Sequence, residues 1–486
     1  MLDSRVGLQE KTVAESVMRS LFLSAVLFAV AGCGGASPPP TPLPLPPAPA
    51  LPPPHAAPLL PTVEGELVGM PGHAVPGMGA TYVWTGLGWI GNDGDVVFEA
   101  VIRYDADLAL GCGILRRARD GLVNPVLMQD QLLQGTGGGR VKHPQLPLHA
   151  AGGTLLIPAL VEGGAVRRAL FAAPRAGGEP LLVAGAQEGE FRNARYARDG
   201  AVIVEVIDGG LASLLRVPPG EPPELLCADC RPGVASDGDR HVARRADGAY
   251  AVADSGALTP LARRGDPVPG TRGVVTEIAG AWVTGSGEIV LHALTDDPQH
   301  PEALLRADAA LEPIALCGSP APGTTGRYGS VSPAAGRGPD ALFGASVEGD
   351  AGVSSAAFAA PLGGTAHLVA ATGAPAGDLP GVLALDERQL VAGAGGQVVS
   401  FARVFFAGAE TARGLFLHTP HGAPERLLTL EDRPTALAGS TIVSFLYEPR
   451  EAVAVDAAGG ILVHVGIRLD RQPDAVYGAL LYRPAR

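Results

Sequence analysis

The chain has 486 residues, enough for a large hydrophobic core or for more than one domain. Charged residues make up 17% of it and aromatic residues only 5%, whereas glycine (67) and proline (45) are abundant. This composition favours many short strands joined by turns over long helices. The net charge is −13 and the basic residues form no cluster, so nucleic acid is excluded as the expected partner.

Residues 21–30 form an apolar run (LFLSAVLFAV) that is too short to span a bilayer, which takes about 20 residues, and that is typical of a signal peptide. The next residues, Val30-Ala31-Gly32-Cys33, resemble the lipobox of bacterial lipoproteins. That resemblance implies a diacylglyceryl group on the Cys33 thiol, cleavage before Cys33 and acylation of the new amine, which together give a firm membrane anchor. We therefore predict a signal peptide over 1–32, with Met18 as an alternative start, and lipidation of Cys33.

Residues 33–62 are predicted to form a disordered tether after the lipidated cysteine. Proline dominates 37–61, and proline lacks the amide donor that helices and sheets need. Such a segment stays extended at about 3.1 Å per residue, so it reaches on the order of 75 Å. A proline-rich recognition motif is the alternative interpretation. Gly34 stands where the sorting rule of lipoproteins places Asp for retention in the inner membrane, so the resemblance implies an outer-membrane location.

From residue 63 onward one pattern recurs about every 50 residues: a turn glycine, then alternating apolar residues, then a small or β-branched residue six positions after the glycine. Period-two alternation predicts a β-strand in each copy. The clear copies are Gly94-Asp-Val-Val-Phe-Glu-Ala100, Gly153-Thr-Leu-Leu-Ile-Pro-Ala159, Gly200-Ala-Val-Ile-Val-Glu-Val206, Gly287-Glu-Ile-Val-Leu-His-Ala293, Gly396-Gln-Val-Val-Ser-Phe-Ala402 and Gly459-Gly-Ile-Leu-Val-His-Val465. Degenerate copies begin at Gly238 and Pro339.

Each copy is followed by a second strand that often ends in arginine, a third strand after Pro or Glu, a turn such as Gly265-Asp-Pro-Val-Pro-Gly270, and a less regular fourth strand. Four strands in roughly 50 residues is the period of a propeller blade. We predict an all-β propeller over 63–486 with eight four-stranded blades. Seven blades is the runner-up, because the copy at Gly238 is short. The last copy lacks an outer strand, which the N-terminal strand near 64–69 is expected to supply.

The repeat resembles a family of exported bacterial proteins with tandem Asn-x-x-Gly-x-x-x-Ala-Phe signatures and Gly-Asp-x-x-Pro-Gly turns. The resemblance covers most of 63–486 and implies a fold, with no settled activity. The asparagine of the signature is absent here: its position holds Gly91, Thr284 and Asp456 in three copies. A two-sheet sandwich or a β-helix is the structural alternative, and the unequal repeat lengths argue against a β-helix.

Cys227-Ala-Asp-Cys230 is the sharpest short motif. In an exported protein this spacing favours a local disulfide over free thiols, redox chemistry or a metal site, which would need a second ligand pair. Cys112 and Cys317 are expected to be buried small residues, with a bond between them as the alternative.

The histidines and acidic turns offer weaker candidates. His292 and His464 share the position five residues after the repeat glycine, where a common ligand site competes with ordinary packing. His418-Thr-Pro-His421 is expected to be a plain turn. The acidic pairs Asp93 with Asp95 and Asp237 with Asp239 lack the full spacing of a calcium loop, so plain turns are favoured there too.

No nucleophile elbow, zinc-protease motif or phosphate loop occurs in the sequence, and we predict no catalytic residue, metal or cofactor. The leading hypothesis is a binding or scaffold module on the cell envelope, held by its lipid anchor and facing a protein or glycan partner. The alternative is an extracytoplasmic hydrolase or lyase acting on glycans or lactones in the central funnel. An enzyme should gather ionisable groups with shifted pKa values there, whereas a scaffold should expose an apolar patch.

Overall fold

The computed structural model describes residues 65–482 except 92–93, 152, 176, 231–234, 238–239, 309, 337, 351, 394–395, 420–421, 434–439, 446–452, 456–458 and 470–474. The chain divides into the units Met1–Pro49 and Ala50–Arg486, and every described residue belongs to the second unit. The predicted signal peptide, Cys33 and the proline-rich tether therefore lie outside the described residues. No helix in the described part is long and apolar enough to cross a membrane.

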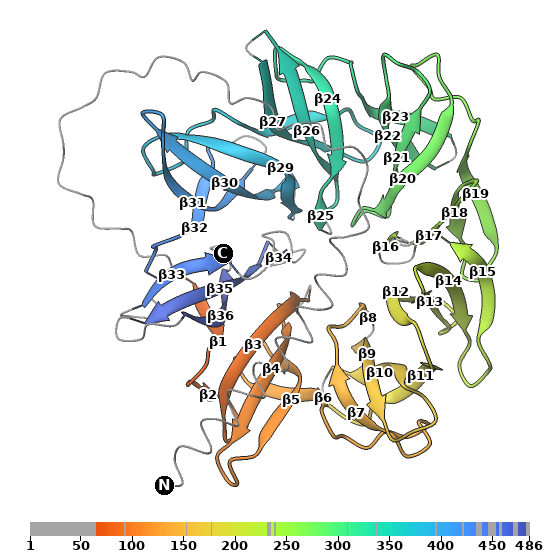
Figure 1. The fold of residues 1–486 in the computed structure, drawn as a ribbon, viewed down its shortest axis with the longest axis vertical. Helices are drawn as coiled ribbons and strands as arrows, with labels where there is room; N and C mark the ends of the chain where they lie inside the picture. The colour runs from red at the N-terminus through yellow and green to blue at the C-terminus, as the bar shows by residue number, and fades with distance from the viewer. Residues whose placement is uncertain are drawn as a thin grey trace, which may run out of the picture. The chain divides into compact units, whose positions relative to one another are not determined.

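The second unit is built from strands that form eight sheets, or blades, arranged in a ring (Figure 1), with all strand pairs antiparallel except β25 with β29. Blade 1 contains β2 (Ala74–Val75), β3 (Ala80–Ile90), β4 (Val96–Tyr104), β5 (Leu110–Arg117) and β6 (Val123–Met128). Blade 2 contains β7 (Arg140–Pro144), β8 (His149–Ala151), β9 (Thr154–Glu162), β10 (Arg168–Pro174) and β11 (Leu181–Ala186). Blade 3 contains β12 (Glu190–Tyr196), β13 (Val202–Asp208), β14 (Leu211–Val217) and β15 (Glu224–Cys230). Blade 4 contains β16 (Ala235–Asp237), β17 (Arg240–Arg245), β18 (Gly248–Val252) and β19 (Leu258–Arg263).

The second half of the ring repeats this plan. Blade 5 contains β20 (Val275–Val283), β21 (Ile289–Thr295), β22 (Glu302–Ala307) and β23 (Leu311–Leu316). Blade 6 contains β24 (Arg327–Pro333), β26 (Ala341–Gly349), β27 (Gly352–Ala360) and β28 (His367–Ala371). Blade 7 contains β25 (Ala335–Gly336), β29 (Val382–Ala392), β30 (Val398–Phe406), β31 (Ala409–His418) and β32 (Glu425–Thr429). Blade 8 contains β33 (Ser440–Phe445), β34 (Val453–Val455), β35 (Ile461–Leu469), β36 (Ala475–Tyr482) and β1 (Glu66–Gly69).

The predicted closure of the ring is confirmed. Strand β1 pairs antiparallel with β36, so that Glu66 lies opposite Leu481, and it forms the outer edge of blade 8. The short copy at Gly238 is a complete four-stranded blade, so the runner-up of seven blades is wrong. The first and last strands of the described chain therefore share one sheet, and β1 covers the edge of β36 that would otherwise be unpaired.

Eight clusters of buried apolar side chains lie between successive blades and make up the core of the described residues. Along β4, Val96 and Phe98 pack toward blade 8, whereas Val97 packs toward blade 2. Both faces of each blade are therefore buried, which explains why the strands after the repeat glycine read as nearly continuous apolar runs. A fully buried side chain of this size contributes about 1.5–3 kcal/mol.

The inner strands of several blades bulge opposite the residue four or five positions after the repeat glycine. Such bulges interrupt β3 between Thr85 and Gly88, and β12 between Arg192 and Arg195. In blade 3 the space holds Glu205, which is fully buried and accepts a hydrogen bond of 2.6 Å from the side chain of Asn193. The bulges thus leave room for polar residues within an apolar core.

In each blade the turn that carries the repeat glycine and the turn two strands later along the chain lie at the same end of the antiparallel sheet. We call the side of the propeller that carries these turns face 1. In blades 1, 3 and 5 the strand before the repeat glycine turn, β3, β12 or β20, lies nearest the centre of the ring (Figure 1). Residues of face 1 therefore come from turns that are far apart in sequence and belong to neighbouring blades.

Candidate functional site

The cysteines that the sequence singled out lie in three blades. Cys227 and Cys230 are joined by a disulfide within β15, the outer strand of blade 3, with their Cα atoms 6.1 Å apart. The oxidation state of this pair in the cell stays a prediction. Cys112 and Cys317 are free, in blades 1 and 5, and burial is the main cause that raises the pKa of Cys112 to about 11 and that of Cys317 to about 12. Thiols held protonated in this way are poor nucleophiles.

The two histidines that share a repeat position are not brought together. His292 lies in blade 5, where its Nε2 is 3.5 Å from Glu302 Oε2. His464 lies in blade 8, three blades further on, and is fully buried, with both ring nitrogens lacking a hydrogen-bond partner among the described residues. His418 ends strand β31 instead of lying in a turn, and its Nε2 is 2.7 Å from Ser400 Oγ; His421 lies outside the described residues. A shared histidine site is thus absent from the described part of the chain.

Burial of His464 should make the protein sensitive to acid. Burial lowers the pKa of His464 from 6.5 to about 4, so between pH 6.5 and pH 4 the unfolded chain binds more protons than the folded one. The free energy of unfolding should therefore decrease as the pH is lowered from 6.5 to 4. The loss caused by His464 should reach about 3 kcal/mol at pH 4. His464→Phe, which copies Phe401 at the same position of blade 7, should lose about 3 kcal/mol less than wild type between pH 7.5 and pH 4 in denaturant titrations.

His73→Asn is the matched control for this prediction, because His73 is exposed before β3. It should show the same loss of stability on acidification as the wild-type protein. An unchanged acid response of His464→Phe would show that protonation of His464 does not accompany unfolding.

The turn residue Asp95 is an ion-pair acceptor. It is buried directly after the repeat glycine Gly94, and Arg116 Nε donates to its Oδ2 at 2.6 Å. Arg175 of blade 2 donates to the same oxygen at 3.2 Å. Asp93 and Asp239 lie outside the described residues, and no three acidic, histidine or cysteine residues in the described part are placed to hold a metal ion.

Arginines near the ends of β5, β14 and β22 recur on face 1, and in blades 3 and 5 this arginine contacts both its own blade and the next one. In blade 5, Arg306 pairs with Glu288, the residue after the repeat glycine, as Arg116 pairs with Asp95 in blade 1. Arg306 Nη2 also donates to the carbonyl oxygens of Pro361 and Gly364 in blade 6, at 3.1 and 3.2 Å. These arginines were visible in the repeat pattern, but the carboxylates that they pair with were not. The acid that follows the glycine was the signal that could have identified the pair.

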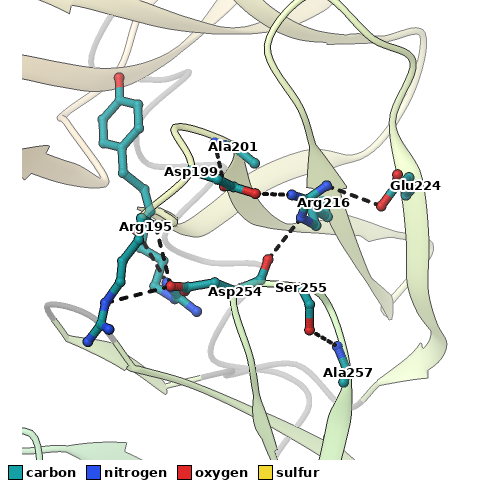
Figure 2. Close-up of polar contacts among 10 residues, drawn as sticks. Arg195, Asp199, Ala201, Arg216, Glu224, Asp254, Ser255 and Ala257 are labelled. Atoms are coloured by element: carbon teal, nitrogen blue, oxygen red, sulfur yellow. Dashed lines mark hydrogen bonds and ion pairs between the residues drawn. The ribbon is translucent and has the colours of Figure 1, made fainter.

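Figure 2 shows the junction of blades 3 and 4, where this pattern is densest. The side chain of Arg195 is only 1% exposed, and its Nη1 donates to Asp254 Oδ1 at 2.8 Å. Arg216 Nε donates to the carbonyl oxygen of Asp254 at 2.9 Å and also pairs with Asp199. The hydrogen bond from Arg195 is the main cause that lowers the pKa of Asp254. The turn that follows β18 is therefore fixed from two sides by blade 3.

A cleft of about 940 Å³ begins at this turn and lies between blades 4 and 5 on face 1. Its described walls come from the start of β17, the end of β18, strand β19 and the turn between β20 and β21. The polar lining includes Arg198, Arg240, His241, Asp254, Glu288 and Asp308. Apolar lining is given by Val252, Leu261, Ile289 and Leu362. This volume lies within the range of small-molecule sites, about 300–1,000 Å³.

The charged groups of the cleft are held in defined positions. Arg240 Nη1 donates to the carbonyl oxygen of Gly287 at 2.9 Å, and its Nη2 donates to Asp308 Oδ1 at 3.2 Å. Ser286 Oγ donates to the carbonyl oxygen of Pro339 at 2.6 Å, which ties the wall to the next blade. The arrangement is a fixed array of donors and acceptors, the chemistry of polar recognition.

The cleft matches neither of the two features expected from the sequence, a central funnel of ionisable groups or an exposed apolar patch. It is lined by turns and outer parts of the blades instead of a central funnel. The large exposed apolar side chains are spread over separate blades, as for Leu108 in blade 1, Leu211 in blade 3 and Leu362 in blade 6. The raised pKa of Glu99, about 7 through burial, belongs to a strand of blade 1. The described residues thus show a charged cleft where an apolar patch or a funnel site was expected.

Solved structures with similar folds are remote in sequence. The β-propeller domain of the Trilobed protease from Pyrococcus furiosus is 11% identical, with a TM-score of 0.37 over 74% of this chain and 98% of that chain. A puromycin-hydrolyzing peptidase of Mycobacterium tuberculosis is 14% identical, with a TM-score of 0.36 over 83% of this chain and 61% of that chain. A streptogramin B lyase is 13% identical, with a TM-score of 0.32 over 68% and 92%. This chain therefore spans less than two thirds of the length of that peptidase.

No family model and no curated protein matches the chain. The strand pairing itself defines the class: eight sheets of four or five strands in a ring, closed by pairing of β1 with β36, make this an eight-bladed β-propeller.

Proposed function

We propose that the chain is an exported lipoprotein, anchored to the envelope through Cys33, whose propeller binds a polar envelope partner in the cleft between blades 4 and 5. The cleft carries the proposal, because its charged side chains are fixed by bonds between neighbouring blades and so are ready for a ligand without rearrangement. The lipobox-like residues 30–33 and the proline-rich 37–61 support an anchor followed by a spacer.

Binding fits the chemistry of the cleft better than catalysis does. Arg240 pairs with Asp308 and Arg306 with Glu288, so these charges balance one another in a way that suits recognition. The free thiols have raised pKa values and lie away from the cleft lining. A hydrolase or lyase acting on glycans or lactones is the second candidate, and the observation that favours it is Glu99, whose pKa of about 7 suits proton transfer.

Affinity capture of the full-length protein from its own envelope, after mild cross-linking, tests this proposal. The wild-type protein should capture a reproducible partner, and Cys33→Ala and Arg240→Gln should each lose it. Arg119→Gln is the matched control, because Arg119 is exposed in a face 1 turn of blade 1. Recovery of the propeller alone, or equal capture by Arg240→Gln, would contradict the proposal.

A further inference from the structure

The described lining of the cleft holds three arginines and three carboxylates, so its formal charges balance, in a chain whose net charge is −13. Arg198, Arg240 and Arg306 line it, and Arg195 lies behind Asp254; the carboxylates of the described lining are Asp254, Glu288 and Asp308.

Among the lining arginines, Arg198 is the one whose guanidinium is least engaged by the protein. It is 84% exposed, and its Nε lies 3.9 Å from Asp254 Oδ2, while the other oxygen of that carboxylate is already bonded to Arg195. The guanidinium of Arg198 therefore offers its donors to an anion, and a carboxylate matches their fork geometry.

Acceptors lie beside these donors at the mouth of the cleft. Arg240 is 43% exposed and Asp308 is 73% exposed, within one ion pair of 3.2 Å. Deeper in the wall, Glu288 Oε2 is buried and has no hydrogen-bond partner among the described residues, while Oε1 is bonded to Arg306. A hydroxyl group both donates and accepts, so paired donors and acceptors of this kind suit a ligand rich in hydroxyls.

The apolar lining completes the match. Leu261 and Leu362 offer aliphatic surface within a cleft of about 940 Å³, so the C–H faces of sugar rings can pack beside the polar groups. The volume is large enough for several rings in a row.

We infer that the cleft binds an acidic oligosaccharide, a short chain of sugar rings that carry carboxylates. A ligand carboxylate lies against Arg198 and Arg240, and ligand hydroxyls lie against Asp308. The inference rests on the proposed binding function and names the ligand class for the same site.

Calorimetric titration of the full-length protein with trigalacturonate and trimannuronate tests this inference, with neutral maltotriose as the reference ligand. The wild-type protein should bind at least one uronate trimer at least ten times more tightly than maltotriose. The Arg198→Gln, Arg240→Gln double variant should bind that trimer at least ten times more weakly, and 0.5 M salt should weaken wild-type binding because exposed charges are screened. Arg119→Gln should bind like the wild-type protein, and an unchanged thermal midpoint shows that the double variant is folded.

Three results would overturn the inference: no binding of either uronate trimer, equal binding of maltotriose, or unchanged binding by the double variant. Failure of the inference is distinguishable from failure of the proposed function. A partner that is captured by the wild-type protein and lost in Arg240→Gln, with no uronate binding, would leave the binding function standing and exclude the ligand class.

Discussion

Val68→Asp in the full-length chain is expected to lower the free energy of unfolding by at least about 4 kcal/mol, the range of a buried unpaired charge. Val68 lies in β1, is only 3% exposed, and packs among residues of blades 1 and 8 such as Phe98 and Leu481. The introduced carboxylate would have to be buried without a partner or expel β1 from blade 8. In the second case the edge of β36 becomes free to pair with another chain. Denaturant titration measures the first effect, and light scattering after size-exclusion chromatography measures association.

His73→Asp is the matched control, because it places the same carboxylate at an exposed position a few residues further on. It should change the unfolding free energy by less than about 0.5 kcal/mol, as surface substitutions usually do. A wild-type unfolding midpoint for Val68→Asp would show that β1 does not close the ring.

Arg195→Met is expected to destabilise the protein by about 3 kcal/mol, because removing one partner of a buried ion pair leaves the other groups unsatisfied. Arg195 bonds Asp254 Oδ1 at 2.8 Å and the carbonyl oxygens of Tyr196 and Val252 at 3.2 Å each. Asp254 is 30% exposed, so water restores part of the loss and keeps the value at the lower end for buried pairs. Denaturant titration at pH 7.5 measures the effect.

Arg198→Met provides a control on the same carboxylate. Arg198 is 84% exposed and lies 3.9 Å from Asp254, so its loss should cost no more than about 0.5 kcal/mol. The double variant Arg195→Met, Asp254→Asn should recover part of the stability, since the unpaired carboxylate is gone. Equal effects of the two arginine variants would contradict the role assigned to Arg195 at the junction of blades 3 and 4.

The architecture was predictable because each blade repeats a local signal. The glycines at 94, 200, 287 and 459 adopt positive φ, between 81° and 84°, at the turn before the second strand, where a side chain would be strained. The apolar run that follows each of them is buried from both sides, so the repeat of the blades can be read from the sequence. The N-terminal strand was identifiable because the last copy lacked a fourth strand.

The cleft could not be predicted in the same way. Its walls come from turns of blades 4 and 5, and the buried pair Arg195–Asp254 that fixes one of them joins residues 59 positions apart. A repeat pattern says which residues are equivalent, but it does not say which side chains of neighbouring blades meet. Arg116 and Arg306 were visible in the sequence as the arginines that end a repeated strand. Their partners Asp95 and Glu288 were identified only in the structure, where the ion pairs can be seen.

Hydrogen exchange of the full-length protein, with and without solubilised envelope material, tests most directly whether the cleft is the binding site. Binding there should slow exchange of the amides of 284–289 and 251–254, which line the cleft, and should leave 118–122, a face 1 turn of blade 1, unchanged. Slower exchange confined to the inner strands, or to turns on the opposite face, would contradict the assignment of function to the cleft between blades 4 and 5.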